Sequence, residues 1–469
     1  MFEFNLNDRS YNHVHFIGIG GISMSGLAEI LISKGYFVSG TDSSNSSIVE
    51  HLKNIGARIY IGHNIENVLG ADLVIYTDAI SNDNIELIAA RSLNVPVVDR
   101  ASFLGAIMKN YNHSIAVSGT HGKTTTTSML ATIINHSDLN PTILLGGELD
   151  DIGGNVKLGS DNYLLTEACE YKANILKYFP SIAVVLNIDE DHLDFFKSID
   201  HITDTFMKYI NNLKEEDTLI ANIDDPQVKK LTEVAESKLV TIGVENTADY
   251  VARNIQFDLA GYPSFDLYIK DVFEGNIKLS VMGIHNVYNS LAAIAASYYI
   301  NVNKELIMDK ITSYTGVHRR LELKGYLGNV RIIDDYAHHP TEIKASLSAV
   351  RNSTKEKVFC IFQPHTFTRT KALLDSFSEA FTDADRVIIA DIYAARELDN
   401  GEVHSRDLAN LIKRRGIDSL YLGSFKEIED FILYEARNHD TVITMGAGNI
   451  YQVGHNLLNR YKSEIKEII

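Results

Sequence analysis

The sequence Gly119-Thr120-His121-Gly122-Lys123-Thr124 stands between an apolar run and an apolar helical pattern. The run before it, Ser114–Ser118, is short and predicts a buried β-strand. After it, Met129, Leu130 and Ile133 repeat at helical spacing. A strand that leads into a glycine-rich loop and then a helix is typical of an α/β sheet with a phosphate-binding loop.

Two glycines, a lysine and a threonine give this loop the chemistry of a nucleotide phosphate site. Glycines let backbone amides approach a triphosphate, Lys123 is placed for its β- and γ-phosphates, and the Thr124 hydroxyl is placed to bind magnesium. The spacing is unusual, because Gly119 lies two residues too close to the Gly-Lys pair and Val117 stands where a longer loop has its first glycine. A chance Gly-Lys-Thr in a surface turn is the alternative, and the flanking strand and helix favour the phosphate loop.

An acidic residue ends the next predicted strand. Tyr163–Thr166 has the pattern of a β-strand, and Glu167 follows it directly. A carboxylate at a strand end beside the phosphate loop suits magnesium, which prefers oxygen ligands. Taken alone, a solvated acid at a strand end is the simpler interpretation.

A second apolar strand, Ile182–Leu186, leads into a strongly acidic segment, Asp189–Asp194, which contains His192. Partly buried acids around one histidine need a counter-charge, and a second cation would supply it. The alternative is an ordinary loop in which His192 is hydrogen-bonded and binds no metal.

Another glycine cluster lies near the start of the chain. An apolar run, His13–Ile17, leads into Gly18–Gly21 and a helical pattern, and the short strand Phe37–Gly40 is followed by Asp42. This order predicts a nucleotide-binding βαβ unit. The sixth position of the glycine pattern is Ser23, so the match alone is weak evidence for a dinucleotide.

Strands and helices alternate a third time from Gly316 onward. Such alternation predicts a parallel sheet covered on both faces. The expected strands are Val330–Ile333, Val358–Phe362, Val387–Ala390 and Val442–Met445, and the expected helices are Glu342–Val350 and one through Leu373 and Phe377.

Composition excludes several classes of protein. The chain has 469 residues, 43 basic against 61 acidic, and a formal net charge of −18. This balance argues against a phosphate-tracking nucleic-acid binder and against a membrane-surface role. Two cysteines imply no disulfide framework, and we find neither a signal peptide nor an apolar run that could span a bilayer. We therefore expect a cytoplasmic enzyme.

Together these stretches resemble the Mur ligase family, and the resemblance covers almost the whole chain. One such motif would be weak evidence, whereas eight in this order are specific. The motifs are His15–Gly21 with Met24–Gly26, Gly119–Thr126, Asn187–Asp189 with Asp191–Asp194, His285-Asn286 with Asn289, His318–Arg320, Asp334–Glu342, Gln363–His365 with Thr368–Thr370, and Gly446–Gly448.

The resemblance implies an α/β fold of three domains. The first is Rossmann-like and holds a UDP-sugar, the second is an ATPase of the phosphate-loop type with a mixed or parallel sheet, and the third is a Rossmann-like doubly wound sheet that closes over ATP and binds the amino acid. From the beginnings of the three sheets we place these domains at residues 1–111, 112–315 and 316–469.

The implied activity is ATP-dependent amide formation in the synthesis of peptidoglycan precursors. ATP would phosphorylate the lactyl carboxylate of UDP-N-acetylmuramate, and the amine of L-alanine would then displace phosphate from the acyl phosphate. ATP and magnesium are the expected cofactors. The expected partners are these small molecules, without nucleic acid or membrane, and we expect a monomer or a weak homodimer.

The resemblance also implies roles for single residues. The implied catalytic residues are Lys123, His192 and Arg320, the metal ligands are Thr124, Glu167 and His192, and the amino-acid-binding residues are His339 and Arg369. The residues implied for the UDP-sugar are Gly18, Gly20, Gly21, Ser23 and Asp42. Those implied for ATP are Gly119, Thr120, His121, Gly122, Lys123, Thr124, Thr125, Asn286, Asn289 and Asp335.

The chain departs from the family at one point. Related ligases usually read Glu-Ala-Asp-Glu-Ser-Asp where this chain has Glu167–Lys172, so that Cys169 and Tyr171 replace an acid and a hydroxyl. Glu167 and Glu170 are retained. The expected magnesium carboxylate is therefore in place, and the substrate contacts beside it are the least predictable part of the site.

Three other functions remain open. A ligase that adds a whole cell-wall tripeptide to the same sugar shares the phosphate loop, but the acidic segment around His192 favours the single amino acid. A dehydrogenase that uses the first glycine loop would leave Lys123 and the acidic segment without a role. A nucleotide-binding module without turnover is disfavoured because Lys123, Glu167 and His192 are all present.

Overall fold

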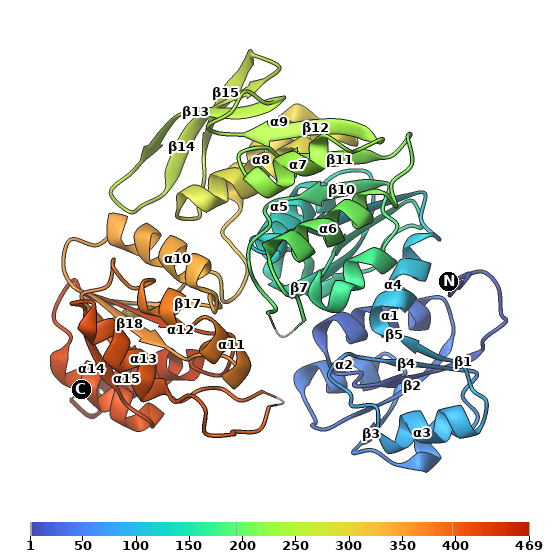
Figure 1. Ribbon diagram of the computed structural model, residues 1–469, viewed down its shortest axis with the longest axis horizontal. Helices are drawn as coiled ribbons and strands as arrows, with labels where there is room; N and C mark the ends of the chain where they lie inside the picture. Colours follow the sequence, from blue (N-terminus) through green and yellow to red (C-terminus); the bar gives the residue numbers. More distant parts are fainter. Residues whose placement is uncertain (1, 194, 396, 469) are drawn as a thin grey trace. The chain divides into compact units, whose positions relative to one another are not determined.

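The first glycine loop follows the central strand of a five-stranded parallel sheet in the computed structural model (Figure 1). The structure describes residues 2–193, 195–395 and 397–468, except for the side chains of residues 462–468. The strand order is β3-β2-β1-β4-β5, so the chain reverses direction across the sheet between β1 and β4. The strands are β1 (His13–Ile17), β2 (Phe37–Asp42), β3 (Arg58–Ile61), β4 (Leu73–Tyr76) and β5 (Val97–Asp99). The helices are α1 (Ile22–Ser33), α2 (Ser47–Asn54), α3 (Ile85–Ser92) and α4 (Arg100–Met108), with a 3₁₀ turn η1 (Ile65–Val68).

The phosphate-loop sequence joins β6 to α5 in a second sheet. Its strand order within the first compact unit is β12-β11-β10-β6-β9-β7-β8, and only β8 is antiparallel to its neighbour. The strands are β6 (His113–Ser118), β7 (Thr142–Leu149), β8 (Gly154–Lys157), β9 (Tyr163–Glu167), β10 (Ile182–Val185), β11 (Thr218–Asn222) and β12 (Lys238–Gly243). The helices are α5 (Lys123–Asn135), α6 (Ile199–Ile210) and α7 (Pro226–Thr232), with 3₁₀ turns η2 (Asp150–Ile152) and η3 (Tyr171–Lys177).

The chain divides into two compact units. The first contains Met1–Ile188, Asp200–Ala248 and Ala292–Lys310, and the second contains Asp189–Ile199, Asp249–Leu291 and Ile311–Ile469. Two helices, α8 (Ile284–Tyr299) and α9 (Lys304–Ser313), contribute to both. The second unit also contains an antiparallel meander of β13 (Tyr250–Phe257), β14 (Pro263–Ile269) and β15 (Val272–Lys278). The predicted boundaries after residues 111 and 315 stay a prediction.

The C-terminal sheet has the order β16-β17-β21-β18-β19-β20, with β16 antiparallel at one edge. One apolar cluster lies among α10, α12 and α13 and another among α14 and α15, so both faces of the sheet are covered, as the sequence predicts. The strands are β16 (Glu322–Leu327), β17 (Val330–Asp335), β18 (Val358–Phe362), β19 (Arg386–Ile389), β20 (Asp418–Tyr421) and β21 (Thr441–Met445). The helices are α10 (Pro340–Asn352), α11 (Phe367–Ala372), α12 (Leu374–Ser378), α13 (Ser405–Arg414), α14 (Phe425–Glu435) and α15 (Tyr451–Ile468).

Small differences from the predicted elements arise where the pattern of side chains is ambiguous. The single helix expected through Leu373 and Phe377 is divided at Leu373 into α11 and α12. The predicted strand Ile182–Leu186 ends one residue earlier, at Val185, although the Leu186 amide still donates to the Ser118 carbonyl at 3.1 Å. These shifts leave the site residues in place.

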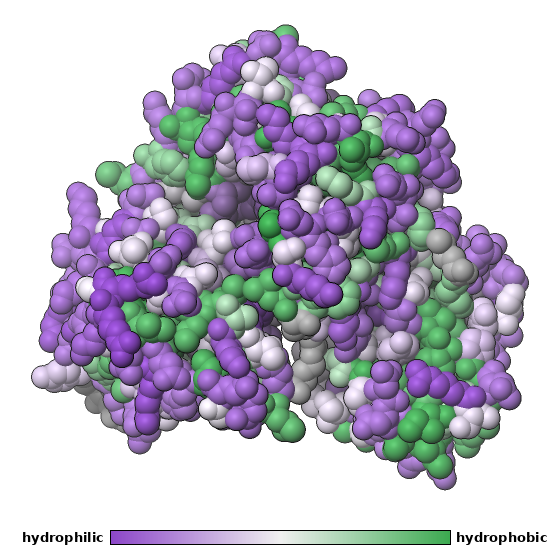
Figure 2. All heavy atoms as spheres, in the orientation of Figure 1, coloured by the Kyte–Doolittle hydropathy of each residue, from purple (hydrophilic) through white to green (hydrophobic). Residues whose placement is uncertain are grey.

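The surface is mainly polar. Figure 2 shows hydrophilic side chains over most of the visible face, with apolar groups in smaller areas. Within the described residues, none of the helices has the length and apolar character that crossing a membrane requires.

Candidate active site

The second glycine loop is held in shape by Asn187, just after β10. The Thr120 amide donates to the Asn187 carbonyl at 3.0 Å, and the His121 amide donates to its Oδ1 at 2.7 Å. Gly119 has φ +132°, and a Cβ there would lie 3.1 Å from the backbone of Asn187, so only glycine fits. Gly122, with φ +83°, precedes α5 and leaves the first amides of that helix without a side-chain cap. This arrangement suits a phosphate group.

Lys123 begins α5 and turns back over its own loop. Its ammonium donates to the carbonyl oxygens of Gly119 and Thr120, the latter at 3.0 Å, and it lies 3.0 and 3.2 Å from the two carboxylate oxygens of Glu170. Burial alone would lower the pKa of Lys123, but the buried Glu170 carboxylate outweighs this and the pKa is raised. The lysine is therefore positively charged in the absence of nucleotide.

Thr124 and Glu167, both predicted magnesium ligands, lie side by side. The Thr124 hydroxyl donates to Glu167 Oε2 at 3.0 Å, and the Gly146 amide donates to Oε1 at 2.7 Å. A Cβ at residue 146 would lie 2.8 Å from Oε1, so glycine there lets β7 approach the carboxylate. The pair offers hard oxygen donors next to the phosphate loop, and this fits magnesium. His192, the third predicted ligand, belongs to the second unit.

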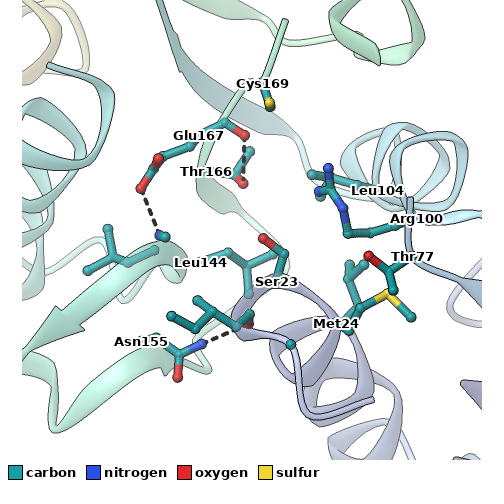
Figure 3. A pocket seen from close by; sticks show the side chains of 15 residues that line it. Ser23, Met24, Thr77, Arg100, Leu104, Leu144, Asn155, Thr166, Glu167 and Cys169 are labelled. Atoms are coloured by element: carbon teal, nitrogen blue, oxygen red, sulfur yellow. Dashed lines mark hydrogen bonds between the residues drawn. The ribbon is translucent and has the colours of Figure 1, made fainter. Parts of the chain in front are cut away.

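A pocket of about 330 Å³ brings the first glycine loop and Glu167 together (Figure 3). Its walls come from the start of α1, the end of β4, the first turns of α4, the strand β7 and the end of β9. The start of α1 has no side-chain cap, so its free amides favour an anion. The lining residues are Gly21, Ile22, Ser23, Met24, Leu27, Thr77, Arg100, Leu104, Leu144, Leu145, Gly146, Asn155, Thr166, Glu167 and Cys169.

The first glycine loop is tied to the end of β2. The Gly18 amide donates to the Thr41 carbonyl at 2.8 Å, and the Gly20 amide donates to Asp42 Oδ2 at 2.9 Å. A Cβ at residue 20 would lie 2.8 Å from that oxygen, so a side chain there would displace the Asp42 carboxylate. Asp42 Oδ1 accepts from the Ser44 amide at 3.3 Å. Asp42, which the resemblance places at the ribose, therefore also shapes the loop.

In the second unit, Asp335 ends β17 in a buried position. It accepts hydrogen bonds from the Ala337 amide at 2.9 Å and from the Ser346 hydroxyl at 2.7 Å, and burial raises its pKa to about 6. Arg320 lies 3.9 Å from Glu342 and stacks over the Tyr336 ring at 5.0 Å. Asp335 and Arg320 are thus near the same strand end, with Arg320 partly exposed.

Asp191 and Arg369 form a buried ion pair. Arg369 Nε and Nη2 donate to Asp191 Oδ1 at 3.2 and 3.1 Å, and the His192 amide donates to the same oxygen at 2.6 Å. Burial opposes ionisation of Asp191, but His192, Arg369 and nearby histidines lower its pKa overall. His192 has φ +54°, which is strained for a residue with a side chain, so this network holds its backbone. Asp194, part of the same motif, lies outside the described residues.

His339 occupies the N-terminus of α10. Its Nδ1 accepts from the Thr341 amide at 3.3 Å, and its Nε2 lies 2.9 Å from the Glu190 carbonyl. Both ring nitrogens are therefore engaged with backbone groups of the same unit. For His339 to contact the amino acid, as predicted, one of these two hydrogen bonds would have to break.

Asn286 and Asn289 lie one helical turn apart in α8 and are buried. Asn289 Nδ2 donates to Asn286 Oδ1 at 3.0 Å, and Asn286 Nδ2 donates to the Met282 carbonyl at 2.7 Å. The preceding His285 has its pKa lowered to about 4 by burial, so its ring is neutral. The pair is thus a neutral, hydrogen-bonding surface, which suits a nucleobase.

Three consecutive segments of the chain match models of known protein families. Family models match residues 13–112 (Mur ligase family, catalytic domain), 117–297 (Mur ligase middle domain) and 319–448 (Mur ligase, glutamate ligase domain). A protein from Acetivibrio thermocellus named UDP-N-acetylmuramate–L-alanine ligase is 50% identical over 454 residues, which cover 97% of both chains. The chain belongs to the Mur ligase family. The prediction made from the motifs is confirmed, and so is the three-domain α/β fold.

Solved structures of Mur ligases agree with this assignment. The UDP-N-acetylmuramate–alanine ligase of Thermotoga maritima is 28% identical, with a TM-score of 0.82 and coverage of 96% of this chain and 99% of that one. The murein peptide ligase of Psychrobacter arcticus has a TM-score of 0.72 and covers 96% and 98%, but at 24% identity it supports the fold alone.

Sequence reasoning missed three residues that shape this Mur ligase site. Asn187 was part of a motif but had no predicted role, although its place at a strand end beside the loop was a usable signal. Glu170 lies three residues after Glu167, and this proximity was the only indication of its contact with Lys123. Arg100 gave no signal, because its place in the pocket wall depends on which strands meet at the sheet edge.

Proposed function

We propose that this Mur ligase joins L-alanine to the lactyl carboxylate of UDP-N-acetylmuramate and cleaves ATP to ADP and phosphate. The main support is the pocket shared by the first glycine loop and Glu167, because a substrate held there reaches from a diphosphate site to the phosphate loop. The 50% identity with the named ligase, over 97% of both chains, supports the choice of substrates.

The first step is phosphoryl transfer. A lactyl carboxylate oxygen attacks the γ-phosphorus of ATP, the bond to the β,γ-bridging oxygen breaks, and ADP leaves with that oxygen. The Lys123 ammonium and the amides of residues 119–124 would neutralise charge on the phosphates, as positioning and charge stabilisation account for most of this catalysis. Magnesium, held by Thr124 and Glu167, would supply further charge neutralisation when bound.

The second step is amide formation. The alanine amine attacks the acyl carbon, phosphate leaves with its bridging oxygen, and the amine gives up one proton. His192 is the proposed proton acceptor unless it binds a metal, and Arg369 would pair with the alanine carboxylate. Arg320 would act in the first step, where it would stabilise the transferring phosphoryl group. Asp335, Asn286 and Asn289 are proposed to contact the nucleotide. A cytoplasmic location and a monomer or weak homodimer stay predictions.

The test is a stoichiometric assay of the purified protein. Phosphate release should require ATP, UDP-N-acetylmuramate and L-alanine together, and mass spectrometry should find one new amide per ADP formed. Phosphate release at the same rate with and without UDP-N-acetylmuramate would contradict the proposal.

A further inference from the structure

The pocket in Figure 3 contains one cationic side chain, Arg100, that the proposed mechanism does not use. Arg100 is the first residue of α4 and follows β5 directly. Its position is fixed by Asp99, whose carboxylate accepts the Ser102 amide at 3.0 Å and caps the helix. Figure 3 shows the Arg100 side chain extending from the helix into the pocket, on the side of Thr77 and Cys169.

Within the part of the chain that the structure describes, Arg100 forms no ion pair with a carboxylate. Its electrostatic neighbours are Tyr178, Cys169 and Asp78, and no carboxylate among the described residues forms an ion pair with it. Asp78 instead accepts from Asn174 at 2.8 Å. The remaining acid at the pocket, Glu167, is engaged by Thr124 and Gly146. A partly buried guanidinium that forms no ion pair, and whose acidic neighbour Asp78 is hydrogen-bonded to Asn174, favours an anionic ligand.

The order of the strands places Arg100 along the path of a sugar nucleotide. The carboxyl ends of β2, β1, β4 and β5 carry, in that order, Asp42, the loop Gly18–Gly21, Thr77 and Arg100. Neighbouring strands lie about 4.8 Å apart, so Arg100 is about 10 Å from the glycine loop along this edge. A ligand whose diphosphate lies at the start of α1 therefore presents its sugar end to Arg100, beside Glu167.

We propose that Arg100 binds the lactyl carboxylate of the sugar nucleotide; this inference rests on the proposed function. The planar guanidinium matches a carboxylate through two parallel hydrogen bonds. Leu104, Met24 and Leu144 line the same pocket, and their apolar surfaces strengthen the ion pair by excluding water. Holding the carboxylate here places its oxygens near Glu167 and Thr124, where the phosphoryl group is to be transferred.

The experiment compares two ligands that share the UDP moiety and differ in the carboxylate. UDP-N-acetylmuramate carries the lactyl arm, and UDP-N-acetylglucosamine lacks it. Calorimetry would measure both affinities for the wild type, Arg100→Met, Arg100→Lys and the control Arg91→Met, which removes an exposed arginine from α3. Arg100→Met should weaken binding of UDP-N-acetylmuramate about tenfold or more, the loss expected for a charge-assisted pair, while Arg100→Lys loses less.

Binding of UDP-N-acetylglucosamine should change less than about twofold in every variant, since a carboxylate contact is absent from it. Equal weakening of both ligands by Arg100→Met would overturn the assignment, because the contact would then be with the UDP moiety. Unchanged affinity for UDP-N-acetylmuramate would also overturn it. Failure of the wild type to bind UDP-N-acetylmuramate would instead contradict the proposed function itself, so the two failures are distinguishable.

Discussion

Lys123 and Glu170 form an ion pair in which the ammonium nitrogen lies 3.0 Å from a carboxylate oxygen. The Glu170 side chain is almost completely buried, and the Lys123 ammonium contacts both of its carboxylate oxygens. The lysine therefore has two connected roles: it neutralises an internal acid in the free protein and is proposed to meet the phosphates of ATP.

Removing only the lysine should destabilise the protein. Lys123→Met removes the ammonium that contacts the buried Glu170 carboxylate, which we expect to cost about 3 kcal/mol in the free energy of unfolding. The double variant Lys123→Met/Glu170→Gln should recover most of that loss, because the remaining amide carries no charge. Thermal or denaturant unfolding of the single and double variants is the measurement. A double variant as unstable as Lys123→Met would show that the ion pair does not account for the effect.

The same double variant separates folding from catalysis. If Lys123 contacts the phosphates, the recovered stability of Lys123→Met/Glu170→Gln should not restore ligation. Turnover should then stay about a hundredfold or more below that of the wild type. Single-turnover assays with saturating substrates would measure this. Near-normal turnover by the stable double variant would contradict the phosphate-loop assignment.

Glu167→Gln should shift the magnesium dependence of activity. The amide preserves the shape of the side chain and its place beside Thr124 but removes the charge that favours a divalent cation. We expect the midpoint of a magnesium titration to rise about tenfold or more. Glu148→Gln changes an exposed acid in the neighbouring strand β7, and this matched control should leave the midpoint unchanged. An unchanged midpoint in Glu167→Gln would make Glu167 a structural acid.

Local patterns explain why much of the fold was predictable. Both glycine loops and the strands before them are continuous segments, so their elements follow from neighbouring residues. The antiparallel meander β13–β15 and the edge strand β16 were not predicted, because their pairing is set by turns and tertiary packing more than by a regular apolar pattern.

The candidate site shows the same division between local and tertiary information. Thr124 and Glu167 were predicted from motifs and lie 3.0 Å apart, although their function as ligands is still a proposal. Glu170 contacts Lys123, and Arg100 lines the pocket, only because strands distant in sequence meet in the fold. Arg369 was predicted to face the amino acid, and its pairing with Asp191 could not be read from spacing because 178 residues separate them.

The buried carboxylate of Glu86, in the N-terminal part of the chain, is expected to make the stability of the protein depend on pH. Burial alone would raise the pKa of its carboxyl, but the side chains of His15, Thr41, Asn67 and His63 together lower it to about 2. A lowered pKa stabilises the folded chain above pH 4.5, and this contribution is lost as the pH falls toward 2. Glu86→Gln should therefore lower the free energy of unfolding by about 3 kcal/mol at neutral pH.

The difference between wild type and Glu86→Gln should shrink as the pH falls below 4.5. Denaturant unfolding across pH 3 to about 7 measures it, with Glu66→Gln, an exposed acid in η1, as the control. A difference that does not depend on pH would mean that packing, and not ionisation of Glu86, causes the loss.

Arg369 and Asp191 provide matched variants for the amino-acid site. If Arg369 binds the alanine carboxylate, Arg369→Met should raise KM for L-alanine about tenfold or more and change KM for ATP little. Asp191→Asn keeps the arginine and weakens its internal competitor, so KM for L-alanine should not rise. Steady-state kinetics of both variants is the measurement. Equal increases in the two variants would mean that Arg369 acts only by holding Asp191 and His192.

Competition between acceptors tests the central claim most directly. L-alanine, glycine, L-serine and a cell-wall tripeptide would be offered together with ATP and UDP-N-acetylmuramate, and mass spectrometry would quantify each product over time. L-alanine should have the highest kcat/KM. The kcat/KM values for glycine and L-serine should be lower, by the factor that corresponds to the about 1–3 kcal/mol that one small group contributes to discrimination. If the tripeptide has the highest kcat/KM, the protein is a peptide-adding ligase and the proposed function is wrong.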